Sequence, residues 1–140
     1  MEIGVLDILE ECPSSLCEAV GVVFDSLPHT DVEYLVANSH RFCVGCEDVE
    51  GLDCLGKVFC NNTNEGEYYV VNIWPCTLGE FSWKDVLYVV AHEVGHLFHL
   101  LHGTFVDGEV DEGLADEFAL GHGFRPDKLE LTSRTSVACF

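Results

Sequence analysis

The feature that most constrains this chain is the pentapeptide His92-Glu93-Val94-Gly95-His96, which lies inside a long apolar run. On an α-helix, His92 and His96 are one turn apart, about 40° around the axis, so both imidazoles can reach one metal ion. Glu93 then lies beside that metal, where a carboxylate can take a proton from a bound water molecule. The pentapeptide therefore predicts a helix with a metal site on one face and a base next to it.

The apolar run, residues 83–101, has the start and stop signals of a helix. Ser82 suits the N-cap, and Asp85 occupies the third helical position of a capping box. Gly103 follows the last apolar residues and suits the C-terminal cap. Because apolar side chains surround the run on all sides, we expect a core helix whose polar motif faces a cavity or a partner.

Composition narrows the classes of partner. With 140 residues the chain is long enough for one domain with a core of its own, and 48% hydrophobic residues are typical of a globular protein. A net charge of −19 predicts no nucleic-acid partner, because phosphate binding needs a basic surface. Two interpretations of the acidic surface stay open, namely a solvated surface and an attraction for basic peptides.

The sequence also lacks the signals of secretion and of membrane insertion. The first eleven residues contain four acidic residues and no basic one, unlike a secretory signal. The polar pentapeptide interrupts the most apolar segment, so we expect no membrane span. These observations predict a cytoplasmic protein, and they leave its oligomeric state open.

Hydrophobic periodicity and turn residues predict the remaining elements and an α+β fold. We expect helices at Ile3–Glu10, Ser14–Ser26 and Glu109–Leu120, strands at Val32–Ala37, Arg41–Val44, Lys57–Cys60 and Glu67–Trp74, a turn at Asn61–Gly66, and an extended tail at 124–140.

Two residues compete to be the third metal ligand. In the longer histidine motif, a glycine at the position of His99 turns the chain so that the last histidine, here His102, reaches the metal. Without that glycine the helix should continue and point His102 roughly 120° away from the metal face. Glu112 lies in the next predicted helix, and Asp116, one turn later, can accept the free N–H of a metal-bound histidine. We therefore expect Glu112 to complete the ligand set.

The two motifs at 92–96 and 111–116 together resemble the gluzincin metallopeptidases. In that family a downstream Asn-Glu-x-x-x-Asp segment supplies a zinc ligand and an orienting carboxylate, and here it reads Asp111-Glu112-Gly113-Leu114-Ala115-Asp116. The stretch 91–119 is most similar to the ImmA/IrrE-type peptidases, small intracellular enzymes of which some cleave or release repressor proteins. The short length resembles a single-domain minigluzincin.

The resemblance implies one zincin-like domain over residues 1–140. Its expected fold is α+β, with a small twisted, mostly antiparallel sheet, an active-site helix and a following glutamate helix. In zincins an edge strand binds the substrate as an added strand. Glu67–Trp74 is the candidate for that strand, and an ordinary core strand is the alternative.

The resemblance also implies a zinc metalloendopeptidase that acts on a protein or peptide substrate. One zinc ion would be held by His92, His96 and Glu112, with Asp116 behind them. Glu93 would be the catalytic base that activates the zinc-bound water. The oxyanion donor stays open among three candidates, which are Tyr88, His99 and His122.

A different class of function is a zinc-binding regulatory or latent, zymogen-like protein with little peptidase activity. Cys139, near the end of the chain, could then supply a thiolate to the open zinc position or lie on a tail that blocks the cleft. The alternative is a disordered terminus or an ordinary disulfide partner.

Eight cysteines are many for a chain without a secretory signal. The spacing of Cys43, Cys46, Cys54 and Cys60 suits a second, structural zinc. Disulfides and buried thiols are the alternatives, and spacing alone does not decide among the three.

Overall fold

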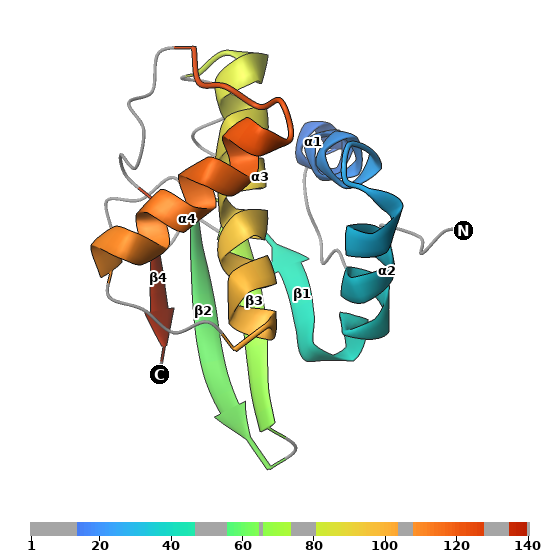
Figure 1. The fold of residues 1–140 in the computed structure, drawn as a ribbon, viewed down its shortest axis with the longest axis vertical. Helices are drawn as coiled ribbons and strands as arrows, with labels where there is room; N and C mark the ends of the chain where they lie inside the picture. The colour runs from blue at the N-terminus through green and yellow to red at the C-terminus, as the bar shows by residue number, and fades with distance from the viewer. Residues whose placement is uncertain are drawn as a thin grey trace.

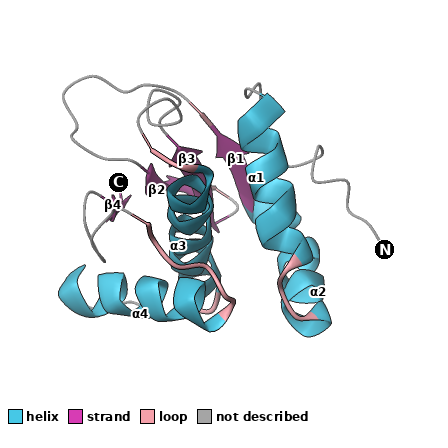
Figure 2. Cartoon of the chain, turned by 90° about the horizontal axis from the view of Figure 1, so that it is seen from above, coloured by secondary structure: helices cyan, strands magenta, loops and turns pink. Residues whose placement is uncertain are grey.

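The fold is arranged around the helix that carries the pentapeptide, labelled α3 in Figure 1. The computed structural model describes residues 14–46, 56–64, 66–73, 81–103, 108–127 and 135–139. The elements in chain order are α1 (Ser14–Asp25), α2 (His29–Ala37), the 3₁₀ helix η2 (Ser39–Arg41), β1 (Phe42–Gly45), β2 (Gly56–Thr63), β3 (Gly66–Ile73), α3 (Trp83–Leu101), α4 (Gly108–Gly121) and β4 (Thr135–Cys139). Figures 1 and 2 show α3 between the sheet on one side and α4 on the other.

The sequence signals of α3 are confirmed. The hydroxyl oxygen of Ser82 accepts a hydrogen bond from the Asp85 N–H at 3.3 Å, as expected of an N-cap. Gly103 has a φ of 77°, in the left-handed region that favours glycine, just beyond the end of the helix. Fourteen of the residues of α3 are buried, so it is the core helix that its composition predicts.

Two other predicted helices are confirmed with small shifts of their ends. The helix expected at Ser14–Ser26 is α1, and the one expected at Glu109–Leu120 is α4. Both pack against α3. The side of α1 that is buried carries Leu16, Ala19, Val20, Val23 and Phe24. The helix expected at Ile3–Glu10 lies outside the described residues.

The strand expected at Val32–Ala37 is wrong, because these residues belong to α2. Valines and a tyrosine favour strands locally, which explains the prediction. The carbonyl of Pro28 instead accepts a hydrogen bond from the Val32 N–H at 3.1 Å and opens a helix. The Tyr34 hydroxyl donates to the carbonyl of Leu101 at 2.9 Å, which ties α2 to the end of α3. Tertiary contacts have here overridden local preference.

The sheet is mixed rather than mostly antiparallel, and this part of the expectation is wrong. The strand order is β1-β3-β2-β4. The β2–β3 pairing is antiparallel, whereas β1–β3 and β2–β4 are parallel. The physical reason is connectivity: β1 and β4 each reach their neighbour through a long connection, and only a short hairpin enforces antiparallel pairing.

The strands predicted at Arg41–Val44, Lys57–Cys60 and Glu67–Trp74 correspond to β1, β2 and β3. The hairpin is longer than expected, because the register continues to the pair Thr63↔Gly66 within the segment predicted as a turn. β3 lies between β1 and β2, so its expected position at the sheet edge is wrong. The alternative of a core strand is the correct one.

The tail expected at 124–140 contains the edge strand β4. Its register pairs Thr135 with Gly56 and Cys139 with Cys60. Because the two strands are parallel, Thr135 lies beside Gly56 at the start of β2, whereas Cys139 lies further along the pair of strands.

No helix among the described residues is long and apolar enough to cross a lipid bilayer.

The cysteines do not form the four-cysteine zinc site in the structure. Cys46 is disulfide-bonded and has no thiolate to offer a metal. Cys17, Cys43 and Cys60 are thiols, and the last two are buried. Cys54 lies outside the described residues.

Candidate metal centre

His92 and His96 lie one turn apart on α3, and neither has any exposed surface. Their ring centroids are 4.8 Å apart, with an interplanar angle of 81°. The helical spacing therefore brings the two imidazoles together as the sequence predicts.

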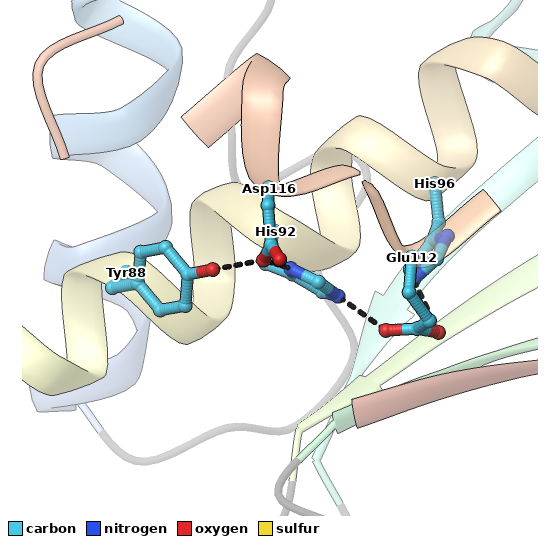
Figure 3. Close-up of polar contacts among 5 residues, drawn as sticks. All are labelled: Tyr88, His92, His96, Glu112 and Asp116. Carbon is cyan, nitrogen blue, oxygen red and sulfur yellow. Dashed lines mark hydrogen bonds and ion pairs between the residues drawn. The ribbon is translucent and has the colours of Figure 1, made fainter. Parts of the chain in front are cut away.

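Glu112 reaches these histidines from α4, as Figure 3 shows. Its Oε1 lies 2.9 Å from His92 Nε2, and its Oε2 lies 3.1 Å from His96 Nε2. Ligand atoms of the three residues all lie within 4.8 Å of one another, and this is the one such group found in the described part of the chain. One carboxylate thus joins both rings at a point where a cation can be held.

Asp116, one turn after Glu112 on α4, holds the other side of the His92 ring. Its Oδ1 accepts a hydrogen bond from His92 Nδ1 at 2.8 Å. The hydroxyl of Tyr88 donates to the same oxygen, so Tyr88, Asp116 and His92 form a chain of hydrogen bonds (Figure 3). Because Asp116 holds a proton on Nδ1, Nε2 is the ring nitrogen that faces Glu112 and that a metal ion can bind once its own proton is displaced.

The charges of the site depend on one another. Burial disfavours the charged form of His92, but hydrogen bonds to Asp116 and Glu112 outweigh this and raise its pKa to about 9. Burial also disfavours the charged form of Glu112, but hydrogen bonds from His92 and His96 outweigh it and lower that pKa to about 2. The site therefore favours a positive charge at the histidines, whether a proton or a metal ion carries it.

Gly95, within the pentapeptide, allows α4 to approach α3 closely. A Cβ atom built at Gly95 would lie 2.9 Å from Cβ of Phe118 and 3.2 Å from Cα of Ala115, both on α4. Contacts this short force a shift, and part of the obstacle is backbone. A larger residue would therefore push α4, with Glu112 and Asp116, away from the histidines.

Glu93, the expected base, is fully buried and lies against the sheet. The atoms nearest to a Cβ placed at Gly56, the first residue of β2, all belong to the Glu93 side chain. The Glu93 side chain is thus held between α3 and β2, whereas Glu112 approaches from α4.

The competing ligand His102 is not part of the group. It is exposed at the C-terminal cap of α3, where its ring stacks on Tyr34 with centroids 4.0 Å apart. Its Nδ1 lies 2.9 Å from the carbonyl oxygen of Phe98. The continued helix has carried His102 away from the metal face, as the absence of a glycine at His99 predicts.

The three candidate oxyanion donors lie in different surroundings. Tyr88 is 2% exposed and donates its hydroxyl to Asp116, so it supports the site from behind. His99 packs its ring near Phe118, and Nδ1 of His122 lies 2.7 Å from the Phe118 carbonyl oxygen. The oxyanion donor stays open among these three candidates.

Three residues have places in the site that the sequence did not indicate. Tyr88 is one turn before His92, and this spacing is the signal that could have placed it near Asp116. Gly95 and Gly56 matter because they have no side chain. Only the tertiary structure shows that Phe118 lies against Gly95 and Glu93 against Gly56.

The donor set fits zinc. Two imidazoles and one carboxylate are typical of catalytic zinc sites, in which a fourth position takes water or substrate. Comparisons of the chain with family models, curated proteins and solved structures find no match. The interpretation of the site therefore rests on the geometry and chemistry of its own residues.

Proposed function

We propose that the protein is a zinc-dependent metallopeptidase of the gluzincin type, with a zincin-like fold. The observation that carries this proposal is the meeting of His92, His96 and Glu112, with ligand atoms within 4.8 Å of one another. Asp116 adds support, because a carboxylate commonly orients a metal-binding histidine through its second ring nitrogen. Glu93 adds support as well, because a purely structural zinc needs no base beside it.

Each residue has a distinct task in peptide hydrolysis. When bound, zinc polarises the carbonyl of the peptide bond and acidifies a water molecule. His92, His96 and Glu112 hold the metal, and Asp116 keeps the proton of His92 on Nδ1 so that Nε2 is free to bind. Glu93 takes the proton of the attacking water and passes it to the leaving amine.

A second candidate is a zinc-binding regulatory or latent protein with little peptidase activity. The burial of the site favours it, because His92, Glu93 and His96 have no exposed surface. β4 also packs against both α3 and α4. If the tail covers the site, ending the chain before Ser136 raises turnover. Unchanged turnover with intact zinc content removes the idea of latency through the tail.

The test of the proposed function measures metal content and turnover on the same samples. We expect about one zinc per chain after dialysis, and hydrolysis of an unstructured protein that a chelator abolishes and added zinc restores. Turnover that survives full removal of the metal contradicts the proposal. Bound zinc without turnover, both before and after truncation of the tail, supports the regulatory candidate instead.

A further inference from the structure

The side chain of Glu93 occupies space that any residue larger than glycine would need at position 56. A Cβ atom built on Gly56 would lie 2.7 Å from Cγ, 3.1 Å from Cδ and 3.2 Å from Oε2 of Glu93. Real Cβ atoms essentially never approach another atom within 3.0 Å. Either the Glu93 side chain or the start of β2 would have to move.

Position 56 requires glycine for its small volume and not for an unusual backbone conformation. Gly66 and Gly103 have φ values of 116° and 77°, where side chains are strained, but Gly56 is not among the glycines with positive φ. Alanine can therefore adopt the backbone conformation at position 56. Any cost of Gly56→Ala then comes from the contact with Glu93.

The contact restricts Glu93 near its backbone. Cγ is the closest atom, and it is the second carbon of the side chain, so turning the carboxylate alone cannot relieve the contact. β2 has little freedom to yield, because Gly56 is paired with Ile73 of β3 and with Thr135 of β4. A side chain at position 56 would therefore drive Glu93 into another rotamer.

We propose that Gly56 is a positioning residue, whose bare backbone lets the Glu93 carboxylate lie between α3 and β2 at the place from which it acts as a base. This inference rests on the proposed function for its consequence in catalysis. Its structural part, the dependence of Glu93 on Gly56, does not require activity.

The first test is a thermal-unfolding cycle with Gly56→Ala, Glu93→Ala and the double variant. Overpacking should lower the Tm of Gly56→Ala by about 3–8 °C. In the Glu93→Ala background the crowded atoms are gone, so the same substitution should change Tm by less than about 1 °C. Gly21→Ala is the control for a glycine-to-alanine change without a steric conflict, because a Cβ there meets nothing within 4 Å. Since Gly21 lies inside α1, this change should keep or raise Tm.

An equal loss of Tm in both backgrounds would overturn the proposal, because the cost would not depend on Glu93. If Gly56→Ala alone does not fold, folding of the double variant supports the proposal, and its failure to fold overturns it.

The second test measures zinc content and kinetics of Gly56→Ala. We expect wild-type zinc content, a KM within about threefold of wild type, and a kcat lower by about 100-fold, since displacement of a reacting group by about 1 Å costs this much. Wild-type kcat in the zinc-loaded variant contradicts a positioning role. If the wild-type protein itself hydrolyses no peptide, the proposed function has failed, and the unfolding cycle alone decides whether Gly56 positions Glu93.

Discussion

The two faces of α3 hold their functional groups by different physical means. Toward α4 the histidines are held by polar contacts: Glu112 joins the two rings, and Asp116 links His92 to Tyr88, over the close approach that Gly95 allows. Toward the sheet, Glu93 lies against a bare glycine, so that shape limits its position. A change of charge or pH should alter the polar contacts, whereas a change of side-chain volume should alter the steric contact. Metal binding and proton transfer should therefore be separable by mutation.

Glu93→Gln should give the largest effect and test that separation most sharply. The amide is nearly isosteric but cannot accept the proton, so kcat should fall by about 10²–10⁴-fold. Zinc content should stay at the wild-type level, because Glu93 is not in the ligand group. Peptide hydrolysis and metal analysis of the same preparation check both parts. Wild-type turnover of this variant would rule out Glu93 as the base.

Glu112→Ala tests the polar face. Loss of this carboxylate should weaken zinc binding by more than about 100-fold, since even supporting residues of metal sites contribute 10–100-fold. His102→Ala is the matched control, because His102 is exposed and outside the ligand group. Competition with a zinc chelator measures both affinities. The reverse order of the two effects would show that the ligand set is wrong.

The pH dependence of zinc binding follows from the raised pKa of His92. Because that pKa is about 9, zinc must displace a proton at neutral pH. The apparent affinity should therefore rise about tenfold per pH unit between about pH 7 and pH 8.5. Chelator competition across this range checks the slope. A flat profile would mean that His92 holds no proton for zinc to displace.

The same pKa values predict how the stability of the protein changes with pH when a chelator is present. The pKa of His92 is raised from 6.5 to about 9, so its contribution is complete below pH 6.5 and is lost as pH rises through 9. The pKa of Glu112 is lowered from 4.5 to about 2, so its contribution is present above pH 4.5 and is lost as pH falls through 2. Thermal unfolding against pH measures both.

Tyr88→Phe should give the smallest effect, and it tests whether the Tyr88 hydroxyl acts through Asp116. The change removes one hydrogen bond to Asp116 and keeps the buried ring, so zinc affinity should fall by less than about tenfold. In an Asp116→Ala background the same change should have no effect on affinity. An equal effect in both backgrounds would mean that the Tyr88 hydroxyl does not act through Asp116.

Much of the arrangement of residues between α3 and α4 could be predicted from the sequence, because it depends on residue spacing within single helices. The spacing of His92 and His96 within one helix, and of Glu112 and Asp116 within the next, places each pair on one helical face. The capping residues of α3 are equally local. What brings the two pairs together is the packing of α4 on α3, which the resemblance to gluzincins implied.

The sheet face could not be predicted in the same way. The contact between Gly56 and Glu93 depends on how β2 lies along α3, and nothing near Gly56 in the sequence indicates it. The mixed pairing of the sheet was missed for a similar reason, because β4 follows β2 in the chain only after β3 and two helices. Helix α2 was predicted as a strand for the same reason. The hydrogen bond from Tyr34 to Leu101, at the end of α3, is also a long-range contact that the local sequence does not indicate.

A crystal structure of the zinc-loaded protein, with an anomalous difference map at the zinc edge, tests the central claim most directly. The account predicts one strong peak within about 2.0–2.2 Å of Nε2 of His92, Nε2 of His96 and a carboxylate oxygen of Glu112. It also predicts that the fourth position is not occupied by a protein side chain. A peak at the cysteines, or a peak at the two histidines with Glu112 turned away, would contradict it.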